Sequence, residues 1–187
     1  MSNQKRLAIA TAVIACFMLA VPVLASGAVW KHNGVNLAKF IELQLPGGEV
    51  FETEISGVKS GMSCEVKATM TTEGGSTAKI TKYEIKSCSG AFGKFVGCTV
   101  SAKEAKGLPW TVHVGASDLT ITNMRIRRTF SAGCALTELD KTITSTTVTL
   151  NTPSKITEME FSGSTTNYKA FGSWKVEGLN SGTYGIG

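Results

Sequence analysis

Three arginines form the densest cluster of charge in the sequence: Arg125, Arg127 and Arg128. Guanidinium groups form paired hydrogen bonds with phosphate, sulfate and carboxylate groups, so such a cluster is typical of an anion-binding surface. On a strand, Arg125 and Arg127 would share one face and Ile126 would point to the other. An exposed sheet face that keeps the protein soluble is the alternative, and we favour it. All three arginines remain candidate binding residues.

Two pairs of carboxylates are spaced for acid and base chemistry: Glu158 with Glu160, and Glu52 with Glu54. Residues two apart on a strand lie about 6.5–7 Å from each other, which is compatible with the separation in glycosidases. Both pairs alternate with other residue types, however, as on the solvated face of a half-buried strand. We therefore assign no catalytic residue, and an extracellular hydrolase with a carboxylate site stays an alternative.

Histidine and nucleophile patterns are sparse. His32 and His113 are the two histidines, and neither has the several nearby ligands that a metal site needs. The Gly-x-Ser-x-Gly turn of serine hydrolases and the glycine-rich phosphate-binding motifs are absent from the sequence. We expect no metal and no cofactor. Trp174 is a further binding candidate, because exposed tryptophans on β-sheets stack on sugar rings, although tryptophan more often fills a core.

The cysteines beyond the amino-terminal segment are Cys64, Cys88, Cys98 and Cys134, which allow three pairings. If Gly74–Ser76 closes a hairpin, positions that sum to about 152 face each other, as Cys64 and Cys88 do. The favoured pairs are then Cys64 with Cys88 and Cys98 with Cys134. Apolar Tyr83 and Ile85 fit a sum of 151 better, and a one-residue bulge would reconcile the two registers.

The elements that carry these residues read as strands. Apolar and polar residues alternate over 65–70, 119–126, 141–144 and 147–150, with a change of phase at Asn123. Turn-forming residues recur at 46–48, 74–76, 89–90, 115–118, 151–153 and 162–164. No stretch gives a convincing amphipathic helix, and residues 40–45 alternate. We predict an all-β fold: one antiparallel sandwich or distorted barrel of about ten strands over residues 29–187.

Residues 1–25 read as a secretory signal peptide with a signal helix, cleaved after Ala25 or as late as Ala28. Lys5 and Arg6 precede an uncharged run of residues 7–25. Two alternatives stay open: a membrane anchor, and a lipoprotein whose lipidated residue is Cys16. The net charge of +5 is mild for 187 residues and does not suggest a nucleic-acid partner. Export favours oxidised cysteines.

The segment Gly107 to His113, together with Cys64, Cys88, Gly97-Cys98, Gly133-Cys134 and the ending 182–186, resembles a group of exported actinobacterial proteins. The resemblance covers essentially the whole chain after the signal peptide. It implies a secreted, disulfide-bearing β-domain and carries no catalytic residue.

We therefore expect a secreted or cell-surface protein without a stable membrane span after cleavage. Its expected role is that of a non-enzymatic binding or structural module that contacts an envelope polysaccharide or an anionic polymer. A self-assembling surface protein is the other alternative, because strand edges can pair with copies of themselves. The sequence leaves the ligand and the oligomeric state open.

Overall fold

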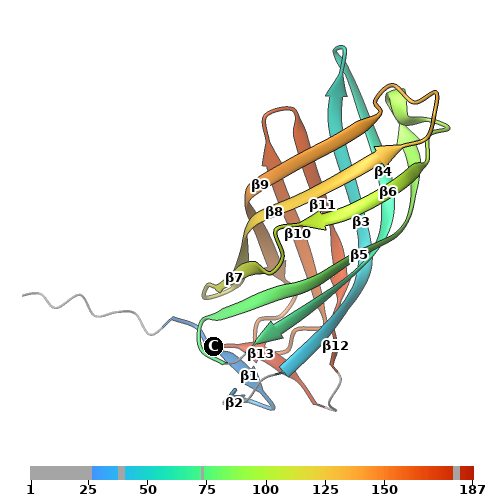
Figure 1. Ribbon diagram of the computed structural model, residues 1–187. Coiled ribbons are helices and arrows are strands. Elements are labelled where there is room, and N and C mark those ends of the chain that lie inside the picture. Colours follow the sequence, from blue (N-terminus) through green and yellow to red (C-terminus); the bar gives the residue numbers. More distant parts are fainter. Residues whose placement is uncertain (1–26, 38–40, 73, 179–181) are drawn as a thin grey trace, which may run out of the picture.

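Eight antiparallel strands close into a barrel in the computed structural model, which describes residues 27–37, 41–72, 74–178 and 182–187 (Figure 1). The sheet order is β11-β10-β9-β8-β7-β5-β4-β3, and pairing of β11 with β3 closes it. The barrel strands are β3 (Ile41–Ile55), β4 (Val58–Thr72), β5 (Thr77–Phe92), β7 (Trp110–Val114), β8 (Asp118–Phe130), β9 (Glu138–Leu150), β10 (Glu158–Thr165) and β11 (Tyr168–Lys175).

Short elements complete the barrel wall. The 3-10 helix η1 (Gly93–Phe95) follows β5, and β6 (Val100–Lys106) pairs with the far half of β8. Strand β12 (Glu177–Gly178) pairs antiparallel with the start of β3, at Gln44 and Leu43. The expected all-β fold is confirmed, and it takes the barrel form of that prediction.

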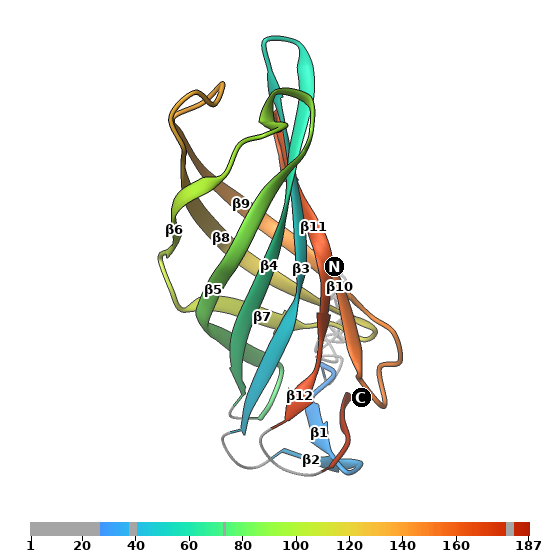
Figure 2. The ribbon, with the colours of Figure 1, turned by 90° about the vertical axis from the view of Figure 1, so that its right-hand side faces the viewer.

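A second sheet covers one end of the barrel (Figure 2). It has the order β13-β1-β2, with β1 (Trp30–His32), β2 (Val35–Asn36) and β13 (Tyr184–Ile186). The backbone N–H of Trp30 donates to the carbonyl of Gly75, and the N–H of Ile156 donates to the carbonyl of Tyr184 at 2.7 Å. Trp30 is fully buried, so this sheet plugs the barrel end.

Alternate residues of each strand point inward and fill the barrel with side chains. One hydrophobic core runs from Trp30 to Ile186 and includes Trp110, Trp174 and Phe51. Two disulfides join Cys64 to Cys88 and Cys98 to Cys134, which is the pairing that hairpin geometry favoured. Such bonds are typical of proteins from oxidising compartments.

The irregularities expected from the alternation pattern are present in the strands. Cys64 faces Cys88, whereas Val66 faces Ile85, so the register changes by one residue between the two pairs. Asn123 lies in the left-handed region at φ 56°, and the buried positions change phase around it. The predicted bulge in β5 and the predicted change of phase in β8 are both confirmed.

Three of the predicted turns are wrong. Residues 46–48, 89–90 and 162–164 lie inside β3, β5 and β10, whereas residues 115–117 and 151–157 do connect strands. Three glycines of these segments, Gly47, Gly90 and Gly163, serve close packing instead. A Cβ on Gly90 would fall 1.6 Å from the carbonyl oxygen of Phe95. The structure has 13 strands among the described residues, eight of them in the barrel, against the ten expected.

The predicted signal peptide, with its signal helix and Cys16, lies outside the described residues. Within the described part of the chain, no helix has the length and hydrophobicity needed to cross a membrane.

Candidate functional site

The arginine cluster is divided between the two faces of β8. Arg125 and Arg127 lie on the outer face, whereas Arg128 points into the barrel and is fully buried. The sequence interpretation that Arg125 and Arg127 share a face, with Ile126 opposite, is correct. Grouping Arg128 with them as a surface residue is wrong, because Arg128 has the same parity along the strand as buried Ile126 and Phe130.

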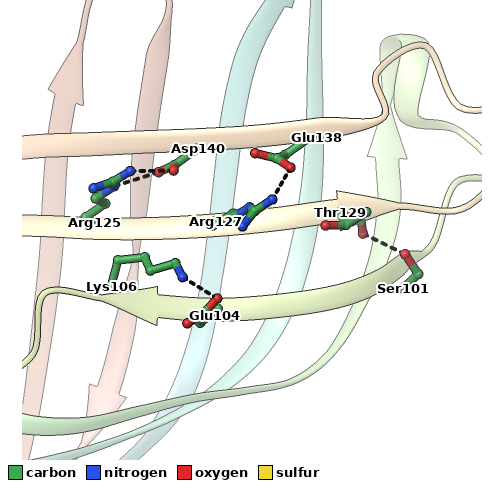
Figure 3. Close-up of polar contacts among 8 residues, drawn as sticks. All are labelled: Ser101, Glu104, Lys106, Arg125, Arg127, Thr129, Glu138 and Asp140. Atoms are coloured by element: carbon green, nitrogen blue, oxygen red, sulfur yellow. Dashed lines mark hydrogen bonds and ion pairs between the residues drawn. The ribbon is translucent and has the colours of Figure 1, made fainter.

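Both outer arginines are held in ion pairs with β9 (Figure 3). Arg125 donates from Nε and Nη2 to the two carboxylate oxygens of Asp140 at 2.9 and 2.7 Å. Arg127 donates to Glu138 at 2.6 Å. The hydrogen bond from Arg125 lowers the pKa of Asp140, and the carboxylates raise the pKa of both arginines. This face therefore carries paired charges rather than free cations for an anionic polymer.

A buried polar cluster occupies the barrel interior around Arg128 and Glu49, both with 0% exposure. Arg128 donates to Glu49 at 2.7 Å and to the hydroxyl of Tyr168 at 3.0 Å. Tyr83 donates its hydroxyl to the other carboxylate oxygen of Glu49 at 3.1 Å. The guanidinium also lies 4.2 Å from the centre of the Phe51 ring. These contacts join strands β3, β5, β8 and β11 across the barrel.

Burial and charge set the protonation of this cluster. Burial raises the pKa of Tyr168 to about 12 and that of Tyr83 well above its ordinary value. Burial alone would lower the pKa of Arg128, but the charge of Glu49 and the two phenols outweigh it and raise that pKa. The cluster is shielded from solvent on every side, so we interpret it as a structural element that fixes the barrel interior.

Trp174 is not available to a ligand on the outer surface. It is 1% exposed and stacks on Phe161, with ring centroids 4.3 Å apart, inside the barrel. The sequence left its direction open. Trp174 shares the parity of the buried residues Tyr168 and Ala170 on β11, and this determines that it points inward.

The carboxylate pairs lie where their alternation indicated. Glu158 and Glu160 face outward on β10, and Glu52 and Glu54 face outward on β3. His113 is exposed on β7, and His32 stacks on Tyr184 at the plugged end. Among residues 27–37, 41–72, 74–178 and 182–187, no three His, Cys, Asp or Glu side chains are grouped to hold a metal ion.

A groove of about 650 Å³ lies on the outer surface where the barrel closes. Strands β3, β11, β10 and β9 form its floor. The register sets Val50, Phe171, Ser162 and Thr147 side by side across these four strands. A parallel row contains Gly48, Ser173, Glu160 and Thr149.

Three glycines, Gly47, Gly48 and Gly172, lie where β3 and β11 meet. A Cβ on Gly172 would lie 2.0 Å from the carbonyl oxygen of Gly48, and a Cβ on Gly47 would lie 2.0 Å from that of Ser173. Since such contacts are impossible, β3 and β11 can approach this closely only with glycine at both positions. Gly48 also leaves the outer surface without a side chain beside Ser173. The outer surface therefore has a depression at Gly48, beside Ser173.

Phe171 is the aromatic residue that faces the groove, because Phe161 of the same lining points inward to Trp174, and it is half-buried. The ammonium of Lys169 lies 4.8 Å from the centre of its ring, which is a cation–π contact. Thr147, Thr149, Ser162 and Ser173 supply hydroxyl groups around it. The groove thus combines an apolar ring with several hydrogen-bonding groups, as pockets for small polar ligands do.

Among the described lining residues, Glu160 is the carboxylate that faces the groove, because the Glu49 side chain points inward to Arg128. Two opposed carboxyl groups, as glycoside hydrolysis requires, are not assembled in this lining. The arrangement can hold a polar ligand without providing an acid–base pair for hydrolysis.

Phe171 and the groove were not among the residues and sites predicted from the sequence. The alternation Lys169, Phe171, Ser173 against Tyr168, Ala170, Trp174 was the available signal, since it places an aromatic residue on each face of one strand. The groove itself depends on the pairing of Val50 with Phe171, which are far apart in the chain.

Comparison with known proteins adds no identification: no family model, curated protein or solved structure matches this chain.

Proposed function

We propose that this protein is a secreted, non-enzymatic binding module of the cell surface or extracellular space, and that its outer groove holds a glycan of the envelope. Phe171 carries this proposal, since an aromatic ring on an open surface offers the apolar C–H face of a sugar a place to stack. The threonine and serine hydroxyls beside the ring match the hydroxyl-rich edges of the same sugar.

The distribution of charge favours a glycan over a purely anionic polymer. Arg125 and Arg127 are engaged by Asp140 and Glu138, and Arg128 is buried. The groove brings together one cationic and one anionic side chain, Lys169 and Glu160. Binding should therefore depend mainly on stacking and neutral hydrogen bonds, which salt screens little.

Two disulfides are compatible with an extracellular location, and the apolar run at residues 7–25 supports export by a signal peptide. The single groove carboxylate Glu160 supports a binding role rather than hydrolysis.

Co-sedimentation tests this proposal. The oxidised protein is mixed with insoluble peptidoglycan, cellulose and chitin, at low salt and at about 1 M salt. We expect pelleting with at least one of these polysaccharides that persists at high salt. Absence of pelleting with all three, or pelleting that high salt abolishes, would contradict stacking in the groove.

The same samples separate binding from hydrolysis. Soluble sugar released from the polymer over time would contradict the non-enzymatic part of the proposal. Such release, if abolished by Glu160→Gln, would point instead to a carboxylate-dependent hydrolase. We expect no release and unchanged polymer mass.

A further inference from the structure

Exposed apolar side chains gather at the end of the barrel opposite the plug. Among the described residues, the large hydrophobic side chains that are exposed are Val35, Val58, Phe92 and Val96. Val35 lies in β2, beside the plugged end, whereas the other three lie at the opposite end, near the β3–β4 hairpin and the segment after β5 (Figures 1 and 2). Val96 is 68% exposed. We call Val58, Phe92 and Val96 the apolar tip.

The connections at this end carry positive but no negative charge. They comprise residues 56–57, 93–99, 131–137 and 166–167, and they contain no aspartate or glutamate. Lys94 lies among them, and Lys59 is the second residue of β4, next to the 56–57 connection. Glu54 faces Lys59 across the hairpin, and Glu138 at the start of β9 is paired with Arg127. The tip therefore combines apolar side chains with two lysines.

The segments that carry the apolar tip are anchored to the barrel. The backbone N–H of Lys94 donates to the hydroxyl of Ser60 at 2.9 Å, which holds η1 against β4. A Cβ on Gly61 would meet the ring of Phe92 at 2.5 Å, so this ring lies directly against the β4 backbone. The Cys98–Cys134 disulfide ties the segment after η1 to the β8–β9 connection. Hence the segment that carries Phe92 and Val96 is anchored to the barrel.

We propose that the apolar tip is a contact site for an anionic lipid surface. Exposed apolar patches on soluble domains mark interaction sites. A lipid surface fits this one, because apolar side chains enter the headgroup boundary while neighbouring lysines remain at the charged headgroups. The groove that contains Phe171 lies on the side of the barrel, on β3, β11, β10 and β9, so the two sites are separate.

Vesicle co-sedimentation tests the proposal with the oxidised full chain. The probes are vesicles of phosphatidylglycerol mixed with phosphatidylcholine, and vesicles of phosphatidylcholine alone. We expect the wild type to pellet with the anionic vesicles and to be released by about 0.5 M salt. The variant F92S/V96S should bind about tenfold more weakly. K59Q/K94Q should also bind about tenfold more weakly and lose its salt dependence.

Val35→Ser is the matched control, since Val35 is 70% exposed at the other end of the molecule. Phe171→Ala, in the groove, is the second control. Every variant carries the same amino terminus, so differences among them report on the tip, and denaturation curves check that each is folded. Equal binding by wild type and F92S/V96S, equal binding to both kinds of vesicle, or no binding at all would overturn the proposal.

Discussion

Glu49 of β3 and Arg128 of β8 form an ion pair of 2.7 Å inside the barrel, with both side chains fully buried. Such a pair costs much desolvation free energy and is tolerated because each charge has its partner. Arg128→Met should therefore lower the free energy of unfolding by about 3–5 kcal/mol, since it leaves the Glu49 carboxylate without its counter-charge. Denaturant titration of the oxidised protein measures this loss.

The double variant E49Q/R128M is the control for that prediction. It removes both charges and should be more stable than R128M alone, because no buried ion is left unpaired. A loss below about 1 kcal/mol for R128M would show that the pair contributes little to stability.

The two buried tyrosines should make the fold sensitive to alkali. The pKa of Tyr168 is raised from 10.0 to about 12 and that of Tyr83 is raised well above its ordinary value, in both cases chiefly by burial. The unfolded chain releases these protons near pH 10, whereas the folded chain retains them. Stability from Tyr168 is thus complete below pH 10 and is lost as the pH rises from 10 to about 12.

Denaturant midpoints measured at rising pH test this dependence. The midpoint should fall more steeply above pH 10 in the wild type than in Tyr168→Phe, which has one titrating phenol fewer. Parallel curves for the two proteins would contradict the assignment.

Two neighbouring glycines should differ sharply in tolerance. Gly172→Ala places a Cβ 2.0 Å from a carbonyl oxygen, whereas the nearest atom to a Cβ on Gly48 is 3.9 Å away. We expect Gly172→Ala to destabilise the barrel by about 1–3 kcal/mol or more, because β11 must move away from β3. Gly48→Ala is the matched control and should cost well under about 1 kcal/mol. Thermal melts compare the two, and similar melting temperatures would contradict the close approach.

The outer ion pairs should matter little for stability or binding. Arg127→Ala breaks an exposed pair with Glu138 and should change the free energy of unfolding by less than about 1 kcal/mol. It should leave polysaccharide pelleting unchanged, because Arg127 lies outside the groove. Loss of pelleting on this substitution would restore the arginine face as the binding surface.

The alternation of residue types was sufficient to predict the fold class and the first disulfide. Cys64 and Cys88 follow from a hairpin sum, and the predicted bulge explains why Ile85 pairs one position out of step. The same alternation also indicates that Arg128 points inward, because Arg128 shares the parity of Ile126 and Phe130. The residue type indicated the opposite direction, because an arginine in a charged run is ordinarily solvated.

The wrong turn at residues 46–48 has a physical cause. Gly47 and Gly48 look like turn formers in the sequence, but Gly47 allows the close packing of β3 on β11 and Gly48 leaves room on the outer surface. Nothing local indicates which of the two roles a glycine in a strand has. The position of Phe171 in a hollow follows only once β11 is known to pair with β3 and close the barrel.

The most direct test of glycan binding compares Phe171→Ala with Phe92→Ala, which removes an exposed ring of the apolar tip, outside the groove. Binding isotherms are measured on the polysaccharide that pellets the wild type. We predict a dissociation constant about tenfold weaker for Phe171→Ala, equivalent to about 1.4 kcal/mol. We predict no change for Phe92→Ala. Equal affinities for wild type and Phe171→Ala would contradict the groove as the glycan site.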